Sequence, residues 1–574
     1  MPFVVAIHRQ PLSTFSGEWW AAALWTLSLV YLLWTRKQYA HMPAVPPVVL
    51  FPLALAVITA VQFLWIRPFQ NDLAGLTPLV FLLGAAAILC GYLVRGRDEA
   101  LHAATMIAGA LLVASLLGVA AQVVQLFRAE FSFFGLVSEY FPTEQRRLWG
   151  NLNQPNHQAT VHGLGLAALV YLAAARRLRL SVALVPAVCL VFGIILTGSR
   201  TGVVHLGLAT LLGLMLAGLS WEFATSRRRR AALVFFSLAL VPMYFFLQPL
   251  VLEASREFGW KLFDAVARLE EGDAGSARAA LWRHAWTMFM AHPWFGVGWM
   301  EFGIEQWRQL RSVGMTVELA QQAHNQVLDL LAKTGALGAG SVLLTLGAWF
   351  WRVLRMTIGA VGTADRARRP AMLLGLSWLA MLCAHSMLEY PLHYLYFFLL
   401  FCFLLGWLEP GGWPLRGTWG RLASWRGWAV VCAVVGGAGL AAVMIDYQRA
   451  EDVTRAATFN PTVPVRPRFW FRDIAEQRQT ARMPLSRANA AEALARHLTA
   501  LRVLPTPSLI QRTALLTAMQ GDTAAAQRMI EDLRFYYWIN PVGERFQTLR
   551  LCATLPAAER PQPYCTPPEL PAGR

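Results

Sequence analysis

The sequence has little charge for its length. Only 14% of its 574 residues are Asp, Glu, Lys or Arg, whereas 56% are hydrophobic. Soluble domains carry about 25% charged residues, so an ordinary soluble protein is excluded. Apolar runs of roughly 17 to 25 residues, long enough to cross the ~30 Å hydrocarbon core of a bilayer as helices, recur as far as residue 445. The sequence therefore predicts an integral membrane protein.

The motifs of familiar soluble chemistry are also missing. The chain has no Walker motif, no G-x-G-x-x-G, no G-x-S-x-G and no metal-ligand spacing of His and Cys. It also lacks the paired acidic signature of a metal-dependent glycosyltransferase. We therefore expect neither a cofactor nor a metal ion.

Cysteine is scarce, with seven residues in the chain. Five lie in apolar runs and are interpreted as inert packing residues. The other two, Cys552 and Cys565, lie near the end of the chain. An oxidising compartment would allow them to form a disulfide, and the sequence leaves open whether they do.

The apolar runs predict an all-α, polytopic helical bundle of about twelve membrane spans. These are residues 19–35, 44–66, 73–94, 101–125, 157–175, 180–196, 203–221, 231–250, 326–350, 371–388, 392–408 and 428–445. No cleavable signal peptide precedes the first run, which reads as a span.

The net charge of +17 is unevenly distributed. Arginines gather in alternate loops, for example at 176–179 and 227–230. The positive-inside rule places these loops in the cytoplasm, so the charge indicates orientation and not a nucleic-acid partner. The two long polar segments, 251–325 and 446–574, then lie on the opposite side, together with the N-terminus.

Two domains are expected. Residues 1–445 form the membrane domain, which includes the mostly helical outer loop 251–325; this loop ends near a Pro/Gly turn, HPWFGVGW. Residues 446–574 form a helical-hairpin domain that resembles tetratricopeptide units. There Gly521 ends one helix, and Asp522 or Thr523 caps the next.

Three arginines on the outer side are candidates for binding an anion. Arg200 lies between two spans, where charge is costly and where the orientation rule disfavours arginine. Arg278 and Arg283 lie in the outer loop, and a guanidinium can bind phosphate oxygens in bidentate fashion. The alternatives are an arginine that snorkels to the interface and a solvated helix face.

His324 directly precedes an apolar helix on the same side. Histidine can accept a proton near neutral pH because its unperturbed pKa is about 6.5. The alternative is a structural residue that caps the helix or makes a structural hydrogen bond.

Polar side chains flank two further spans. The segment NLNQPNHQAT, residues 151–160, offers Gln154, Asn156 and His157 as ligands for sugar hydroxyls or an acceptor chain, although a turn with a helix cap is the plain alternative. Glu389 and Tyr390 lie in HSMLEYPL between two later spans, where a carboxylate could orient a base or neutralise an arginine.

Five segments in this order closely resemble the bacterial O-antigen ligase and polymerase superfamily: NLNQPNHQAT, TGSRTG, SARAALWRHAW with HPWFGVGW, AHNQVLDLLAKTGALG and HSMLEYPLHYLYFF. QPNH, HSMLEYPL and the polar tail are similar to its protein O-oligosaccharyltransferase branch. The resemblance implies a GT-C-like membrane glycosyltransferase with its active site and tail in the periplasm. It would act on an undecaprenyl-diphosphate-linked oligosaccharide in the inner membrane. Relatives often begin with one additional span, so the N-terminus is expected to be short or degenerate.

The resemblance also implies residue roles. His324 matches the essential histidine of the family's His-Asn motif, with Asn325 beside it. Arg200 matches the arginine of its Ser-Arg turn, and Arg278 matches the arginine ahead of the tryptophan in the large loop. His324 would deprotonate an acceptor hydroxyl while the arginines hold the diphosphate, without a metal ion.

The acceptor stays open at this stage. It is a pilin-like protein in the favoured branch, lipid A-core in the ligases and another glycan in the polymerases. A transporter of lipid-linked glycans is the non-enzymatic alternative. We further expect the tail to hold a protein acceptor, so that removing residues from about 455 onward would leave the donor site intact but reduce transfer to folded protein acceptors. The alternative is a purely structural lid, whose loss would lower the stability of the membrane domain and the activity toward every acceptor alike.

Overall fold

The computed structural model describes the whole chain except residue 1 and residues 36–43, 67–70, 96–99, 128–134, 141–144, 220–225, 265–272, 360–362, 415–424, 461, 537–540, 563 and 567–574. The end of predicted span 203–221 and part of predicted loop 251–325 thus lie outside the described residues. Within the described part the chain is all-α, and its only β pairings are three isolated bridges.

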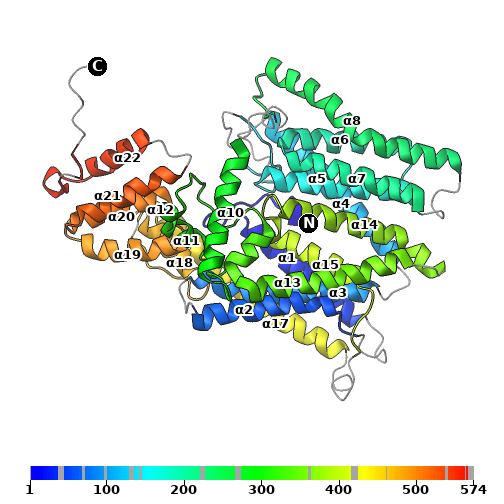
Figure 1. The fold of residues 1–574 in the computed structure, drawn as a ribbon, viewed down its shortest axis with the longest axis horizontal. Coiled ribbons are helices and arrows are strands. Elements are labelled where there is room, and N and C mark those ends of the chain that lie inside the picture. Colours follow the sequence, from blue (N-terminus) through cyan, green and yellow to red (C-terminus); the bar gives the residue numbers. More distant parts are fainter. Residues whose placement is uncertain are drawn as a thin grey trace. The chain divides into compact units, whose positions relative to one another are not determined.

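Each predicted span coincides with a helix (Figure 1). These helices are α1 (Phe15–Trp34), α2 (Leu50–Val61), α3 (Thr77–Arg95), α4 (Ala100–Phe127), α5 (Pro155–Ala174), α6 (Leu180–Thr197), α7 (Arg200–Leu219), α8 (Arg227–Glu257), α13 (Gln326–Gly359), α14 (Thr363–Ser386), α15 (Leu395–Leu408) and α17 (Trp425–Ala456). Short helical turns are η1 (Pro2–Val4), η2 (Pro47–Val49), η3 (Gln62–Ile66), η4 (Asp72–Leu76) and η5 (Pro391–His393).

Eight helical segments among the described residues are long and apolar enough to cross a membrane. They contain α2, α3, α4, α6, α7, α8, α13 and α17, and α15 is a shorter apolar helix. The protein is therefore a multi-pass, all-α membrane protein, as the sequence predicts. The full number of twelve spans remains a prediction.

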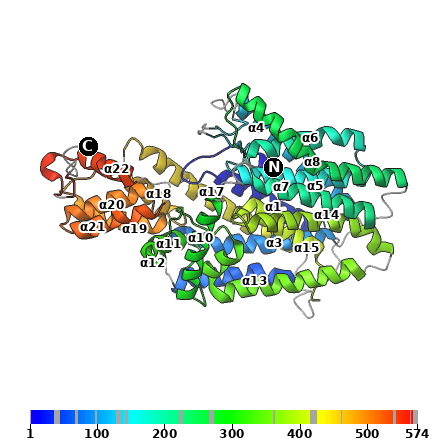
Figure 2. The ribbon, with the colours of Figure 1, turned by 45° about the horizontal axis from the view of Figure 1, so that its top comes forward.

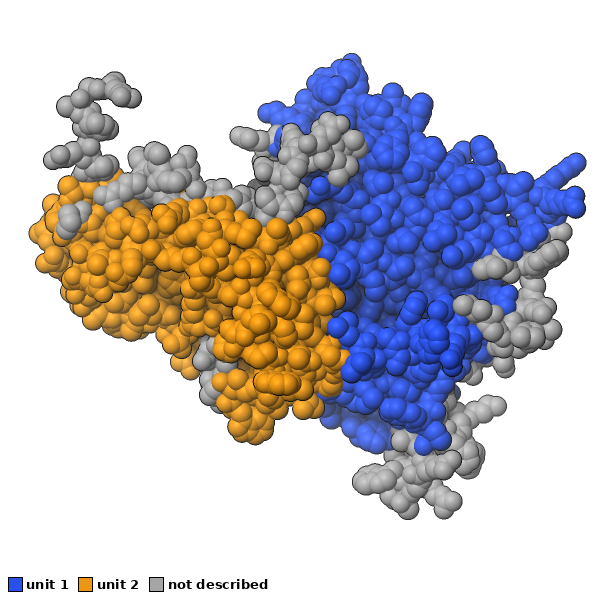
Figure 3. All heavy atoms as spheres, in the orientation of Figure 1, with its two compact units in different colours: residues 1–53, 80–272, 342–440 blue, residues 54–79, 273–341, 441–574 orange. Residues whose placement is uncertain are grey.

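The chain divides into two compact units that do not follow chain order (Figure 3). Unit 1 comprises residues 1–53, 80–272 and 342–440, and unit 2 comprises 54–79, 273–341 and 441–574. The second unit therefore combines most of the predicted outer loop with the C-terminal tail.

Helix α5 is the centre of unit 1. It contacts α4, α6, α7 and α14, and it is buried from His157 to Ala174. Small residues permit this close packing. A Cβ atom on Gly163 would lie 2.6 Å from Cβ of His205, and one on Gly165 would lie 2.3 Å from Oγ of Ser115.

Unit 2 stacks short helices on those of the predicted outer loop (Figures 1 and 2). The loop contributes α10 (Asp273–Ala291), α11 (Phe302–Arg308) and α12 (Leu310–Val313). The tail contributes α18 (Arg472–Thr480), α19 (Ala490–Val503), α20 (Pro507–Met519), α21 (Thr523–Asp532), η6 (Leu533–Phe535), α22 (Pro541–Ala553) and η7 (Ala557–Glu559). Consecutive helices from α18 to α21 pack against one another.

The predicted helical hairpin is confirmed. Gly521 adopts a φ of +94° between α20 and α21. The carboxylate of Asp522 then caps α21 by accepting the backbone N–H of Ala525 at 2.8 Å.

Loop and tail share one hydrophobic core in unit 2. Leu281, Leu310 and Val317 from the loop are buried with Leu509 and Leu515 from the tail. The tail is thus packed against the loop as part of the same compact unit.

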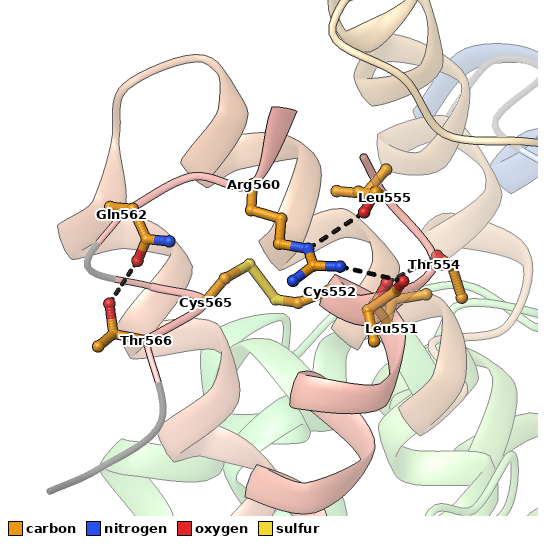
Figure 4. Close-up of a disulfide and its surroundings, with 9 residues drawn as sticks. Leu551, Cys552, Thr554, Leu555, Arg560, Gln562, Cys565 and Thr566 are labelled. Atoms are coloured by element: carbon orange, nitrogen blue, oxygen red, sulfur yellow. Dashed lines mark hydrogen bonds between the residues drawn. A yellow bond between two sulfur atoms is a disulfide. The ribbon is translucent and has the colours of Figure 1, made fainter. Parts of the chain in front are cut away.

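The disulfide that the sequence allowed is present (Figure 4). Cys552 at the end of α22 is bonded to Cys565, with their Cα atoms 5.7 Å apart, and both belong to the shared core. Arg560, between them in the chain, donates to the backbone carbonyl of Leu555 at 3.1 Å. The other five cysteines are free thiols; Cys90 and Cys402 are buried and Cys383 is exposed.

Candidate active site

The predicted site residues fall into two groups, one in each compact unit. Unit 1 holds Gln154, Asn156, His157, Arg200, Glu389 and Tyr390, and unit 2 holds Arg278, Arg283, His324 and Asn325. Each group is described by itself.

Gln154 is the N-cap of α5. Its side-chain oxygen accepts the backbone N–H of His157 at 2.8 Å, and Pro155 occupies the first helical position. Neighbouring Asn151 similarly accepts the N–H of Ser138 at 2.9 Å. Gln154 therefore follows the plain alternative of a turn with a helix cap. Its side-chain amide is occupied by a backbone N–H group of α5.

Asn156 and Glu389 meet, although 233 residues separate them in the chain. The amide of Asn156 donates to the Glu389 carboxylate at 3.1 Å, and Glu389 is 8% exposed. On its other side, Asn156 accepts from the guanidinium of Arg147 at 2.8 Å. Arg147 also donates to the carbonyl of Thr197, which ends α6, at 3.1 Å.

Arg147 was not among the predicted site residues. The sequence pattern that pointed to Arg200 applies to it as well, because Arg147 is also an arginine on the side where the orientation rule disfavours arginine. Its guanidinium connects the amide cluster with the turn that precedes Arg200.

His157 is buried, with only 1% of it exposed. Its Nδ1 lies 3.3 Å from the hydroxyl of Tyr396, and its ring packs edge-on against Tyr394 at 4.3 Å between centroids. Tyr390 stacks on Tyr394 at 6.0 Å. The His157 ring is therefore part of the packed interior beneath Asn156.

The TGSRTG segment forms a tight helix-to-helix turn. Gly198 closes α6 with a φ of +56°, and a Cβ atom there would lie 2.8 Å from Phe263. Arg200 is half-buried and is the first residue of α7. The sequence predicted it in the loop between the two spans, so the helix begins earlier than expected. Helix N-termini favour anions, so this position suits a phosphate-binding arginine.

In unit 2, His324 adopts a left-handed backbone conformation with a φ of +52°. Its Nε2 lies 3.5 Å from the Glu318 carboxylate, and its side chain is 14% exposed. The helix cap belongs to Asn325, whose side-chain oxygen accepts the N–H groups of Val327 at 3.1 Å and Leu328 at 3.2 Å. Of the two structural alternatives, the helix cap is therefore wrong, whereas a structural hydrogen bond of the His324 ring remains the alternative to a catalytic role.

A buried ion pair fixes the turn around His324. One oxygen of Asp329 accepts the backbone N–H of Ala323 at 2.9 Å, and the other lies 3.1 Å from Nζ of Lys333. Both charged residues are only 1% exposed. The sequence signal was a D-x-x-x-K spacing within an apolar helix, which sequence reasoning did not use.

Helix α13 is interrupted one turn beyond the ion pair. Gly335 has a φ of +63°, and a Cβ atom there would lie 2.3 Å from the backbone of Trp294. The predicted turn HPWFGVGW is confirmed and fills the break: the carbonyl of Pro293 accepts the N–H of Ala336 at 2.7 Å, and the N–H of Gly298 donates to the carbonyl of Lys333 at 3.2 Å.

The loop before His324 is held from two sides. Gln306 of α11 accepts the N–H of Ala320 at 3.0 Å and donates to the carbonyl of Glu318 at 2.8 Å. Val317 donates its N–H to the carbonyl of Phe535 in the tail at 2.7 Å. The segment that presents Glu318 and His324 thus depends on tail residues for its position.

The two loop arginines differ in their surroundings on α10. Arg278 is half-buried, whereas Arg283 is exposed beside the 38% exposed ring of Trp282. The buried face carries Leu281 and His284. Within the described ranges, no group of three His, Cys, Asp or Glu side chains is placed to hold a metal ion, and we assign no metal ligands.

Three segments of the chain match known protein families. Residues 148–173 match the family described as protein glycosylation ligase, residues 185–344 match O-antigen ligase, and residues 373–542 match the C-terminal part of the virulence factor membrane-bound polymerase family. These segments contain every predicted site residue.

Two relatives come from Acinetobacter baylyi (strain ATCC 33305 / BD413 / ADP1). A general O-oligosaccharyltransferase is 28% identical over 410 residues, covering 70% of this chain and 66% of the relative. A ComP-specific O-oligosaccharyltransferase is 25% identical over 280 residues, covering 48% of this chain and 46% of the relative. The chain thus aligns with less than two thirds of each relative. Together with the family matches, they show that the chain is similar to the O-antigen ligase family and to O-oligosaccharyltransferases.

Proposed function

We propose that this protein is a glycosyltransferase that moves a glycan from an undecaprenyl-diphosphate-linked donor to a serine or threonine hydroxyl of an acceptor protein. The reaction takes place on the periplasmic face of the bacterial inner membrane. The names of the two relatives, both O-oligosaccharyltransferases, support a protein acceptor. The His324 turn is the observation that carries the proposal, because it presents a histidine that is not needed as a helix cap.

His324 accepts the proton of the acceptor hydroxyl. A proton on Nε2, which faces Glu318 at 3.5 Å, leaves the lone pair of the neutral imidazole on Nδ1. When Nδ1 takes the hydroxyl proton, the Glu318 carboxylate stabilises the imidazolium that forms. A base positioned in this way contributes on the order of 10² to 10⁴ in rate.

The acceptor oxygen then bonds to the anomeric carbon of the glycan, and the bond from that carbon to the diphosphate oxygen breaks. The negative charge that develops on the departing diphosphate is held by Arg200 and Arg278, whose guanidinium groups cannot lose their protons. Asn156, Glu389 and Arg147 form the polar network through which unit 1 contacts the glycan or the acceptor.

The experiment is expression of the chain in a host that makes one lipid-linked glycan but has no O-glycosylation ligase of its own. A pilin-like acceptor protein and a lipid A-core acceptor are both present. Glycan on the protein supports the proposal, and glycan on lipid A-core alone contradicts it.

A second candidate is O-antigen ligation or polymerisation, which the matches at residues 185–344 and 373–542 favour. The same host distinguishes it by the product. A transporter of lipid-linked glycans, the non-enzymatic alternative, is excluded if purified protein forms product from donor and acceptor in detergent.

A further inference from the structure

An arginine-lined cleft lies in unit 2, and its lining includes none of the residues of the proposed reaction. Its volume is about 860 Å³, and it opens between the end of α17 and the segment that precedes α18. Four arginines and a single carboxylate line it: Arg449, Arg466, Arg468, Arg472 and Glu476, with Val465 and Pro467 between them.

A buried carboxylate holds the cleft in shape. Asp446 is 1% exposed and accepts four backbone N–H groups of the segment, from Arg468 at 2.7 Å, Trp470 at 2.9 Å, Phe469 at 3.2 Å and Phe471 at 3.4 Å. These bonds anchor the segment to α17. The arginines therefore extend from a backbone that is fixed before any ligand arrives, which lowers the entropic cost of binding.

The cleft has an excess of positive charge. Arg472 is paired with Glu476 at 2.8 Å. Within the described part of the chain, the side chains of Arg449, Arg466 and Arg468 form no ion pair. Three guanidinium groups that form no ion pair among the described residues thus line one open space, together with the Arg472–Glu476 pair.

The adjoining helix exposes its apolar side chains. Helix α17 is apolar enough to span a membrane, yet only 6% of its apolar stretch is buried within the protein. Val434 is 64% exposed and Ile445 is 50% exposed. Arg449 follows Ile445 by about one helical turn, and the rings of Phe459 and Phe469 are exposed nearby in the chain. Arginine and aromatic side chains just beyond an apolar helix are typical of the headgroup level of a bilayer.

We propose that this cleft binds the phosphate headgroup of an anionic phospholipid of the surrounding bilayer. A guanidinium group binds phosphate oxygens through two parallel N–H donors, and three of them supply more donors than one phosphate needs. The acyl chains of the lipid would lie along the exposed side of α17. This site is independent of the proposed transfer reaction and would fix the depth of unit 2 at the membrane surface.

A polyprenyl-diphosphate donor has the same phosphate chemistry, and the experiment distinguishes the two lipids. The triple variant Arg449→Gln/Arg466→Gln/Arg468→Gln is compared with a charge-matched control, Arg496→Gln/Arg502→Gln/Arg528→Gln, at exposed positions of α19 and α21. The full-length protein is titrated with phosphatidylglycerol and with phosphatidylcholine, and bound lipid is counted by native mass spectrometry.

Phosphatidylglycerol binding should weaken by roughly a hundredfold in the triple variant, because each of the three arginines contributes about 1 kcal/mol near a membrane surface and 1.4 kcal/mol corresponds to tenfold. The control variant and phosphatidylcholine binding should be unaffected. Equal phosphatidylglycerol binding in the triple and control variants overturns the proposal. So does a triple variant that loses only affinity for the polyprenyl-diphosphate donor.

The opposite change is tested by Glu476→Gln, which removes the one carboxylate among the described residues that line the cleft and leaves Arg472 available. This half-buried substitution should tighten phosphatidylglycerol binding several-fold, and this gain should disappear in 0.5 M salt, where the Debye length is about 4 Å. Unchanged binding in Glu476→Gln would also contradict the proposal, and this result does not depend on whether the triple variant folds.

Discussion

His324 has a φ of +52°, which is uncommon for any residue other than glycine, although histidine adopts it more often than most side chains. Such conformations persist where the surroundings enforce them, and they cluster at functional sites. At His324 the enforcing contacts are visible: Asn325 caps the helix, and the Asp329 carboxylate holds the preceding residue. The sequence identified the histidine, but only the structure shows that Asn325, and not His324, caps the helix.

The arginine clamp gives a prediction at the residue scale. Arg200→Lys and Arg278→Lys should reduce transfer nearly as much as alanine at the same positions, since lysine supplies a point charge and not a planar fork. Arg283→Ala should reduce transfer less, because Arg283 lies on the exposed face of α10. Initial rates of glycan transfer in membranes measure this, and full activity in both lysine variants would favour arginines that only snorkel to the interface.

Arg147 gives a second prediction at this scale. Arg147→Gln keeps a donor for Asn156 but loses the second donor to the Thr197 carbonyl. We expect the KM for the acceptor or donor to rise, with kcat less affected. A matched control is Arg146→Gln, whose guanidinium donates to the backbone carbonyl of Gln125 at 2.6 Å and serves packing. If both variants show the same loss of expression and no change in KM, Arg147 has a structural role only.

At the element scale, the first turns of α13 combine a cap, a buried ion pair and a helix break. Asp329→Ala removes the acceptor for the Ala323 N–H and leaves Lys333 buried without its partner, which costs about 3 to 5 kcal/mol. The variant Asp329→Ala/Lys333→Met removes both charges, so it should fold nearly as well as wild type. It should still transfer slowly, because the Ala323 N–H next to His324 has lost its acceptor.

Asp329→Asn/Lys333→Met is the matched control, since asparagine keeps an oxygen that can accept the Ala323 N–H. It should recover most of the transfer rate at similar stability. Transfer rates and thermal unfolding midpoints are measured together. Equal rates in the two double variants would show that the Asp329 oxygen does not position His324.

Sequence reasoning found the elements better than their arrangement. Hydropathy located the spans, and Gly521 with Asp522 located the hairpin, because both signals are local in the chain. The Asn156–Glu389 contact and the packing of α10 to α12 against the tail join residues hundreds of positions apart. A single sequence carries no local signal for such contacts.

At the scale of the whole molecule, the shared core changes the expectation for the tail. The tail and the loop bury Leu281, Val317 and Leu509 together, and Val317 is hydrogen-bonded to Phe535. Removing residues from about 455 onward would expose this core and release the loop that carries His324. This packing favours a structural lid over a separable acceptor-docking tail, so we expect truncation to abolish transfer to a serine peptide and to a folded pilin-like protein alike. If truncation reduced transfer to the folded protein alone, the tail would instead be a separable acceptor-docking domain.

Two buried histidines make unit 2 sensitive to acid. Burial lowers the pKa of His284 and of His497 to about 4 in each case. Between pH 6.5 and 4 the unfolded chain binds more protons at these histidines than the folded chain does. Their contribution to stability is therefore fully present above pH 6.5 and is lost as the pH falls. The loss is up to about 1.4 kcal/mol per pH unit for each histidine. Thermal unfolding midpoints between pH 7.5 and 4.5 should fall less steeply in His284→Gln/His497→Gln. An unchanged slope would assign the acid sensitivity to other groups.

The most direct test of the central claim is glycan transfer by the purified full-length protein and its His324→Ala variant. Both are supplied with a polyprenyl-diphosphate-linked glycan and a pilin-like acceptor, and product is counted by intact-protein mass spectrometry. Wild type should glycosylate serine or threonine, whereas the variant should bind donor with unchanged affinity and transfer on the order of 10² to 10⁴ times more slowly. A His324→Ala protein that glycosylates the acceptor at the wild-type rate would contradict the account.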